Sequence, residues 1–366
     1  MIQTTKTALS YAEAGCRTLM GKFEAEKLPP EGLFHYHQGV FLSGMEGVYF
    51  KTGNKEYGDY IKRYIDSLID EDGNIINYVK ERLDDLQPGI LLFRLIEETN
   101  DPRYEKALHT IMGHIKEWPK NSVGGFWHKF IHPDQMWLDG LYMGGQLMAM
   151  YGAKYNQDWC FEEIYRQATL MWKYCKKQEN GLLYHAWDES KKEPWANPET
   201  GCSPEVWGRA AGWYIVALTI ILEYIPDTSE FKKELIQIVE EYCTAIARYQ
   251  DDETGCWYQI VDKGNREDNW LESSCSALFV CGMAKAIKAG YIEDKFKMIV
   301  DKGFRGVINM IEDNEDGTII VPNICIGTGV DNYDYYKDRP IRENDLHGMG
   351  AFVLMCNAYD SLISEE

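Results

Sequence analysis

Apolar residues recur at every third or fourth position along most of this chain, and short polar runs separate these periodic stretches. Such spacing is typical of helices that bury one face. Twelve helices are predicted, over residues 5–22, 38–51, 57–69, 88–99, 103–117, 134–151, 161–177, 208–224, 229–249, 271–289, 294–311 and 344–363. Every second helix in this order is the more apolar of its pair, and the others carry more charge.

A glycine turn and a short run of aromatic or β-branched residues lead into every second helix. The six turns begin at Gly32, Gly73, Gly125, Gly181, Gly255 and Gly317. A pair of helices cannot bury its own apolar face, so six pairs are expected to stack side by side. We therefore predict an all-α fold: an (α/α)6 barrel with an inner and an outer ring of helices, as a single domain over residues 1–366. The alternative is an open superhelix of tetratricopeptide type, but its repeats are shorter and more regular.

The stretch from Trp127 to Gln146 is the most unusual part of the chain. Pro133 is expected to start a helix there, and that helix is apolar on nearly every side, which predicts a buried position. Asp139 lies in its middle with no basic residue on its own turn. Its carboxyl therefore needs a partner from another segment or has a raised pKa, and buried unpaired acids cluster at functional sites. A purely structural bond to another helix is the alternative.

Polar residues concentrate in the segments that should meet at one rim of the barrel. Six of the eight histidines fall there, namely His35, His37, His128, His132, His185 and His347. A random surface would not give this concentration, and it predicts a binding or catalytic site at the rim.

The formal charge of −20 argues against nucleic acid or an anionic membrane as a partner. An acidic ligand would need a local group of cations. No apolar run has the length of a transmembrane span, and the first residues resemble an amphipathic helix more than a signal peptide. The 10 cysteines form no CxxC pair, which fits buried, reduced thiols. These features predict a soluble, cytoplasmic protein and leave its oligomeric state open.

Two basic residues near the predicted rim could supply those cations. Arg209 lies two residues after Trp207 and four before Trp213, so the cation is expected between aromatic rings. Its guanidinium could hold a carboxylate through two hydrogen bonds, or the group could be a structural cation–π stack. Lys129, next to His128, is the second cation.

Asp84 and Asp85 precede Pro88 at the expected start of a helix, where acids often serve as caps. Alternatively, one of them faces Asp139 across the barrel mouth as a second carboxylate for glycosyl chemistry. The histidine pairs 35/37 and 128/132 could bind a metal, but no HExxH or zinc-module spacing accompanies them. We expect neither a metal nor a cofactor.

Four motifs stand out in this order: HKFIHPDQMWLDGLYM, GLLYHAWDES, WGRAAGWY and YDYYKDRPIRENDLHGMGAF. Together they resemble the unsaturated rhamnogalacturonyl hydrolases of glycoside hydrolase family 105, and the likeness runs from about His35 to Tyr359. It implies an (α/α)6 barrel and an intracellular enzyme that acts after a pectin lyase. The implied substrate is a disaccharide whose non-reducing end is a 4,5-unsaturated galacturonyl unit attached to rhamnose.

The resemblance also implies roles for nine residues. Asp139 corresponds to the family's general acid and base, and Asp84 to its second active-site acid. The implied substrate-binding residues are Tyr36, His128, Lys129, His185, Trp207, Arg209 and Trp213. The chain has WGRAAGW where the family often has WGRGNGW, and His132-Pro133 where it often has Tyr-Pro. These departures leave the exact uronate open.

The implied chemistry is hydration of a vinyl ether. An acid protonates C4 of the C4=C5 double bond, water adds at C5, and the resulting hemiketal opens to free the second sugar. This needs an acid that is still protonated near neutral pH, and Asp139 is expected to be that acid. The alternatives are an unsaturated glucuronyl hydrolase, a conventional inverting glycosidase that uses Asp84 and Asp139, and a sugar-binding regulator without activity.

Overall fold

The computed structural model describes residues 6–364, so the predicted helix start at Thr5 lies outside the described residues. The α-helices within them are α1 Ala8–Lys22, α2 Tyr36–Thr52, α3 Lys55–Asp66, α4 Leu92–Thr99, α5 Pro102–Lys116, α6 Gln146–Tyr155, α7 Asp158–Cys175, α8 Gly208–Tyr224, α9 Glu230–Ala247, α10 Ser273–Lys288, α11 Lys297–Met310, α12 Tyr333–Lys337 and α13 Leu346–Ile363. Shorter helical turns are η1 Ala25–Lys27, η2 Leu83–Asp85, η3 Gln87–Leu91, η4 Leu141–Gly145, η5 Val261–Lys263 and η6 Asp294–Phe296, of which η4 is π-helical and the others 3-10.

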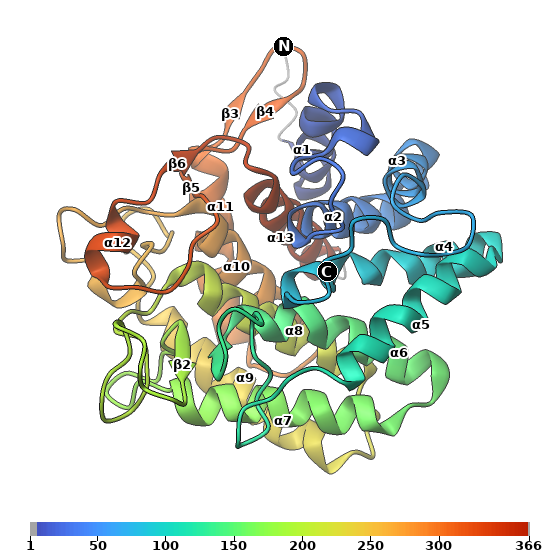
Figure 1. Cartoon of the computed structure of the whole chain (residues 1–366). Coiled ribbons are helices and arrows are strands. Elements are labelled where there is room, and N and C mark those ends of the chain that lie inside the picture. Colours follow the sequence, from blue (N-terminus) through green and yellow to red (C-terminus); the bar gives the residue numbers. More distant parts are fainter. Residues whose placement is uncertain (1–5, 365–366) are drawn as a thin grey trace.

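Six helical segments form a closed inner ring (Figure 1). Each packs on the next in the order α2, η3 with α4, η4 with α6, α8, α10 and α13, and α13 packs back on α2. The helices α1, α3, α5, α7, α9 and α11 lie outside this ring, each against inner helices. The predicted (α/α)6 barrel is therefore confirmed.

The distribution of apolar residues accounts for the two rings. In the inner helix α8, every residue from Gly208 to Leu222 is buried. The outer helix α3 buries Tyr57, Tyr60, Ile61 and Tyr64, which recur with helical spacing, and exposes its charged face. A helix that is apolar all round needs neighbours on all sides, and only a place in the inner ring supplies them.

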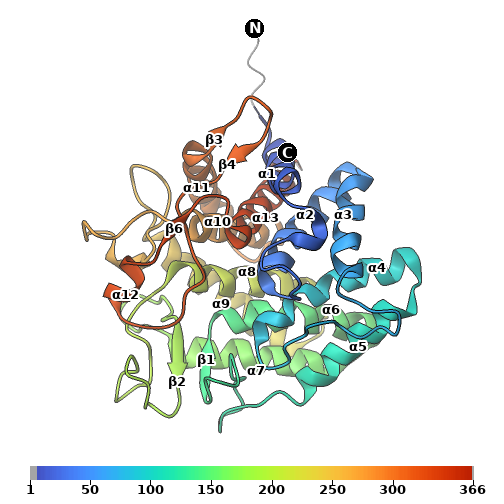
Figure 2. The ribbon, with the colours of Figure 1, turned by 45° about the horizontal axis from the view of Figure 1, so that its top comes forward.

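Short strands pair between the helices. Antiparallel two-stranded sheets join β1 Gln135–Trp137 with β2 Ala186–Asp188, β3 Glu312–Asp313 with β4 Ile319–Ile320, and β5 Ile324–Cys325 with β6 Ile341–Arg342. Figure 2 shows β1 and β2 side by side, although about fifty residues separate them in the chain.

The prediction of a helix over residues 134–151 is wrong at the start of that range. Asp134 adopts the left-handed conformation with a φ of 64°, which interrupts any helix begun at Pro133, and the next three residues form β1. Helical backbone begins at Asp139 and continues through η4 into α6. A short apolar run fits a buried strand as well as a buried helix, and the pairing with β2 decides between them here.

The buried apolar side chains form one cluster that runs from Ala12 to Ala358. All ten cysteines are buried and unpaired. Among residues 6–364, no helix is long and apolar enough to cross a bilayer.

Candidate active site

A cavity of about 370 Å³ opens at the rim where the inner helices begin. Seven of the nine residues implied by the resemblance line it: Tyr36, Asp84, His128, Lys129, Asp139, Trp207 and Arg209. The remaining wall consists of His35, His37, His132, Trp137, Met143 and the segment Gly327, Thr328 and Gly329. The sequence places Tyr36 at the first turn of α2 and Arg209 at the first turn of α8, so helix starts bring these side chains together.

Asp139 has its partner on another segment. The pairing of β1 with β2 brings His185 beside it, with Nε2 of the ring 3.1 Å from Asp139 Oδ2. Burial raises the pKa of the Asp139 carboxyl, but the hydrogen bond from His185, together with the nearby His128, outweighs burial and holds this pKa below its ordinary value. The expectation that Asp139 is protonated near neutral pH is therefore wrong for the protein without substrate.

His185 is fully buried and contacts a residue that the sequence reasoning missed. The hydroxyl of Tyr336, in α12, lies 2.7 Å from Nδ1 of His185. Burial lowers the pKa of His185, so its imidazole is neutral at neutral pH. Tyr336 belongs to the last of the four motifs, but nothing in the local pattern connects it with a histidine 151 positions earlier.

Asp84 belongs to a second polar group on the cavity wall. Its Oδ1 lies 3.4 Å from His128 Nε2, and its Oδ2 lies 3.0 Å from Lys129 Nζ. Burial raises the pKa of Asp84, but His128 and Lys129 together hold it well below its usual range. Asp84 is therefore ionised and can only accept hydrogen bonds.

Asp85 does not line this cavity. Its Oδ2 accepts a hydrogen bond of 2.7 Å from Arg82. Burial raises the pKa of Asp85 to about 7 in spite of that contact. Of the two neighbouring acids, the structure thus brings Asp84 to the candidate site.

Aromatic rings border the cavity on two sides. Trp137 stacks on His128 with ring centres 4.4 Å apart, and Trp207 stacks under the guanidinium of Arg209 at 4.5 Å. Trp213, one turn deeper in α8, packs instead on Tyr142 at 4.4 Å and is not part of the cavity wall. Trp137, which was predicted only as part of a buried helix, lines the cavity.

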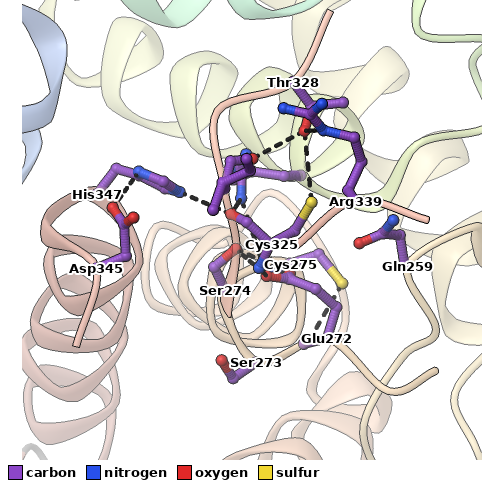
Figure 3. A network of polar contacts seen from close by, with 12 residues as sticks. Gln259, Glu272, Ser273, Ser274, Cys275, Cys325, Thr328, Arg339, Asp345 and His347 are labelled. Atoms are coloured by element: carbon purple, nitrogen blue, oxygen red, sulfur yellow. Dashed lines mark hydrogen bonds and ion pairs between the residues drawn. The ribbon is translucent and has the colours of Figure 1, made fainter. Parts of the chain in front are cut away.

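Both terminal amino groups of the Arg209 side chain donate hydrogen bonds to backbone carbonyls. Its Nη1 donates to the carbonyl of Cys325, and its Nη2 donates to that of Ile326 at 2.6 Å. Figure 3 shows the surrounding network, in which the Cys325 amide donates to Glu272 at 2.9 Å and the Cys325 carbonyl also lies 3.1 Å from His347 Nε2. Arg209 thus holds the segment after β5 in place as one wall of the cavity, besides contributing its charge.

His37, Asp345 and His347 are the one group among the described residues that could hold a metal ion, with one possible ligand atom from each within 4.8 Å of the others. Both nitrogens of His347 already have neighbours, because Nδ1 lies 2.8 Å from Asp345 Oδ1 and Nε2 lies at the Cys325 carbonyl.

Comparisons with known proteins relate this chain to glycoside hydrolases. The profile of glycosyl hydrolase family 88 matches residues 11–362. A solved glycoside hydrolase of family 105 from C. acetobutylicum ATCC 824 is 36% identical, with a TM-score of 0.92 over 96% of this chain and 99% of that chain. The unsaturated rhamnogalacturonyl hydrolase YesR from Bacillus subtilis (strain 168) is 28% identical over 320 residues, which are 85% of each chain.

A more distant relative shares the fold alone. The unsaturated glucuronyl hydrolase from Bacillus sp. GL1 is 13% identical, with a TM-score of 0.68 over 96% of this chain and 95% of that chain. The family 88 profile covers almost the whole chain, and the solved relative from C. acetobutylicum covers it at well above 30% identity. This chain is therefore a glycoside hydrolase that belongs to glycosyl hydrolase family 88 and, with that relative, to family 105.

Proposed function

We propose that this enzyme releases the 4,5-unsaturated uronyl residue from the non-reducing end of a pectin-derived rhamnogalacturonan disaccharide by hydrating its C4=C5 double bond. The observation that carries the proposal is Asp139, a buried carboxylate on the wall of a cavity whose other polar groups are mainly histidines and cations. The similarity to YesR over most of both chains supports the substrate class.

The anionic uronyl group needs positive charge in a protein whose formal charge is −20. Lys129 and Arg209 supply it at the cavity, and we place the uronyl carboxylate within reach of both. Arg209 acts there chiefly through its charge, since both of its amino groups already donate to carbonyls. The sugar ring packs against Trp137 or Trp207 through its apolar face.

Substrate binding must raise the pKa of Asp139, because the carboxyl is ionised in the free protein. A second anion close by and the exclusion of water both favour the protonated form. Asp139 then gives its proton to C4. As a carboxylate again, it takes a proton from the water that adds at C5, and the hemiketal opens to free the second sugar.

Asp84 has a different part in this scheme. Because His128 and Lys129 keep it ionised, Asp84 accepts hydrogen bonds and orients the attacking water or a sugar hydroxyl. A conventional inverting glycosidase would need one of its two carboxyl groups protonated. The hydration proposed here likewise needs Asp139 protonated, so the pKa directions of Asp84 and Asp139 do not separate the two mechanisms, and activity on a saturated glycoside does.

The first experiment follows the ultraviolet absorbance of the conjugated double bond when the purified enzyme meets an unsaturated rhamnogalacturonan disaccharide. We expect the band to disappear with the wild type, and the rate to fall by at least about 10²-fold with Asp139→Asn, since positioned acid–base groups contribute roughly 10²–10⁴-fold. Asp338→Asn, which removes an exposed acid outside the cavity, is the control and should leave the rate unchanged.

Two results would contradict the proposal. Wild-type rates in Asp139→Asn would remove Asp139 from the chemistry. An unchanged band together with cleavage of a saturated glycoside would mean conventional hydrolysis. Unsaturated glucuronyl disaccharides form a second arm of the assay, and preference for them would correct the proposed substrate.

A further inference from the structure

A chain of three polar groups leads away from the cavity beneath Asp139. Tyr336 Oη lies 2.7 Å from His185 Nδ1, and His185 Nε2 lies 3.1 Å from Asp139 Oδ2. Tyr336 and His185 are fully buried, and Asp139 is 9% exposed. Bulk water therefore does not compete for the bond between tyrosine and histidine.

The phenol of Tyr336 determines which nitrogen of His185 carries the proton. Burial raises the pKa of Tyr336 well above its ordinary value, so the hydroxyl keeps its proton and can donate to Nδ1. With that bond formed, Nδ1 of the neutral imidazole is the acceptor, and the one proton of the ring lies on Nε2, opposite the Asp139 carboxylate, which can only accept. From Nε2 that proton is donated to Asp139, and such a donor stabilises the carboxylate form only.

Other contacts keep Tyr336 in place. Its ring stacks on Trp207 with centres 6.1 Å apart and planes 27° apart, and its carbonyl accepts a hydrogen bond from Gln259 Nε2. The short helix α12 is itself capped by the Asn332 side chain, which accepts from the Tyr335 amide at 3.1 Å. The hydroxyl is thus held in its position on the far side of His185.

We propose that Tyr336 is a positioning residue that fixes the tautomer of His185 and so keeps Asp139 ionised until substrate binds. The proposal rests on the role of Asp139 as acid and base given above. Without the hydroxyl, His185 is free to move its proton to Nδ1. Its bare Nε2 would then accept a hydrogen bond from Asp139, which stabilises the protonated carboxyl.

Several other charged or titratable groups face the three side chains of Tyr336, His185 and Asp139. His128 acts on both Asp139 and His185, and Arg209 acts on His185. Tyr36 faces Asp139 from α2, and Glu205 acts on Tyr336. All of them stay in Tyr336→Phe, so a change of titration in that variant reports the lost hydroxyl.

The test is the pH profile of kcat/KM for Tyr336→Phe. An acid that must be protonated gives a rate that falls as pH rises through its pKa in the free enzyme. We expect the midpoint of this fall to move up by about one pH unit in Tyr336→Phe, in the range typical of a lost charge-stabilising hydrogen bond. KM at the plateau should change by less than about twofold, because Tyr336 does not touch the cavity.

Tyr333→Phe is the matched control. It removes another hydroxyl from α12, one that donates to Asp268 at 2.8 Å, and leaves His185 untouched. A merely structural effect of disturbing α12 would lower the rate equally at all pH values in both variants. An unmoved midpoint in a folded Tyr336→Phe would overturn the proposal.

Nitrogen NMR of the histidine side chains separates this inference from the proposed function. In the wild type without substrate, the His185 signals, assigned with His185→Gln, should be those of a neutral ring protonated at Nε2. A ring protonated at Nδ1, or an imidazolium, at neutral pH would refute the role of Tyr336 even if turnover were normal. The NMR result also stands if the enzyme turns out to act on another substrate.

Discussion

Lys129 differs from Arg209, the other cation on the cavity wall, in being open to solvent. Its side chain is 23% exposed against 1% for Arg209. Its ammonium lies 3.0 Å from Asp84 Oδ2 and 5.4 Å from the centre of the Trp137 ring. A flexible, accessible ammonium of this kind can turn toward an arriving carboxylate, whereas the guanidinium of Arg209 is fixed on backbone carbonyls.

Lys129→Met should therefore raise KM more than it lowers kcat. Methionine keeps most of the side-chain stem and removes the charge, and we expect KM to rise about tenfold, the equivalent of about 1.4 kcal/mol of binding. Initial rates over a range of substrate concentrations measure both constants. Lys120→Met is the control, because Lys120 also combines an ion pair, with Glu163, and an aromatic neighbour, Phe126, but lies outside the cavity. A fall in kcat at constant KM would instead assign Lys129 to the transition state.

At the scale of single residues, the sequence motifs indicated which residues belong to the site, and only the fold showed which residues they contact. Asp139 was found from sequence because an isolated acid in an apolar run is conspicuous. Its low pKa could not be predicted, since the group responsible, His185, stands 46 positions further on and arrives through a strand pairing. The same limit applies to Tyr336, which acts through His185.

The packing of inner helices depends on close backbone approach at glycines. Gly350 in α13 faces α2 so closely that an added Cβ would lie 2.7 Å from the backbone nitrogen of Phe41. Backbone atoms cannot rotate aside as a flexible side chain can. Glycine at this position is therefore required by the distance between the two helices.

Gly350→Ala should destabilise the protein by about 1–3 kcal/mol, the usual cost of overpacking a well-packed interior. Gly113→Ala is the contrasting control, since Gly113 lies on the exposed face of α5 with no other atom within 4 Å of an added Cβ. There alanine should stabilise by about 0.5–1 kcal/mol through its better helix propensity. Chemical denaturation followed by circular dichroism measures both, and a shift in the same direction for both would refute this account of the helix crossing.

At the scale of helices and strands, the length of an element determined whether it could be predicted from the sequence. Helices of three or more turns repeat their apolar spacing often enough to be recognised, and the predicted range of α8 is the observed one. Strands of two or three residues, such as β1 and β2, are too short to show alternation, and α12 is a single polar, aromatic turn. For this reason the strands and the short helix α12 between α11 and α13 were not predicted, although this segment forms part of the cavity wall.

The whole molecule carries a formal charge of −20, and its self-repulsion opposes the compact state. The melting temperature should therefore rise by a few degrees between about 0.01 M and 0.15 M NaCl, as the screening length falls from about 30 Å to about 8 Å. Differential scanning calorimetry measures the shift. The same salt step near pH 5, close to the pI of about 4.9, is the control and should give a smaller rise. Equal shifts at both pH values would show that screening of net charge is not the cause.

The return of α13 onto α2 fixes how many helical pairs the fold can contain. An open solenoid tolerates the duplication or loss of a unit, because each unit touches only its neighbours and the ends are free. In a ring, a seventh pair would have to change every crossing angle, and a lost pair would leave an opening onto the core. Proteins that evolve from this one can therefore vary the segments at the rims of the barrel. They cannot lengthen the barrel by duplicating a helical pair.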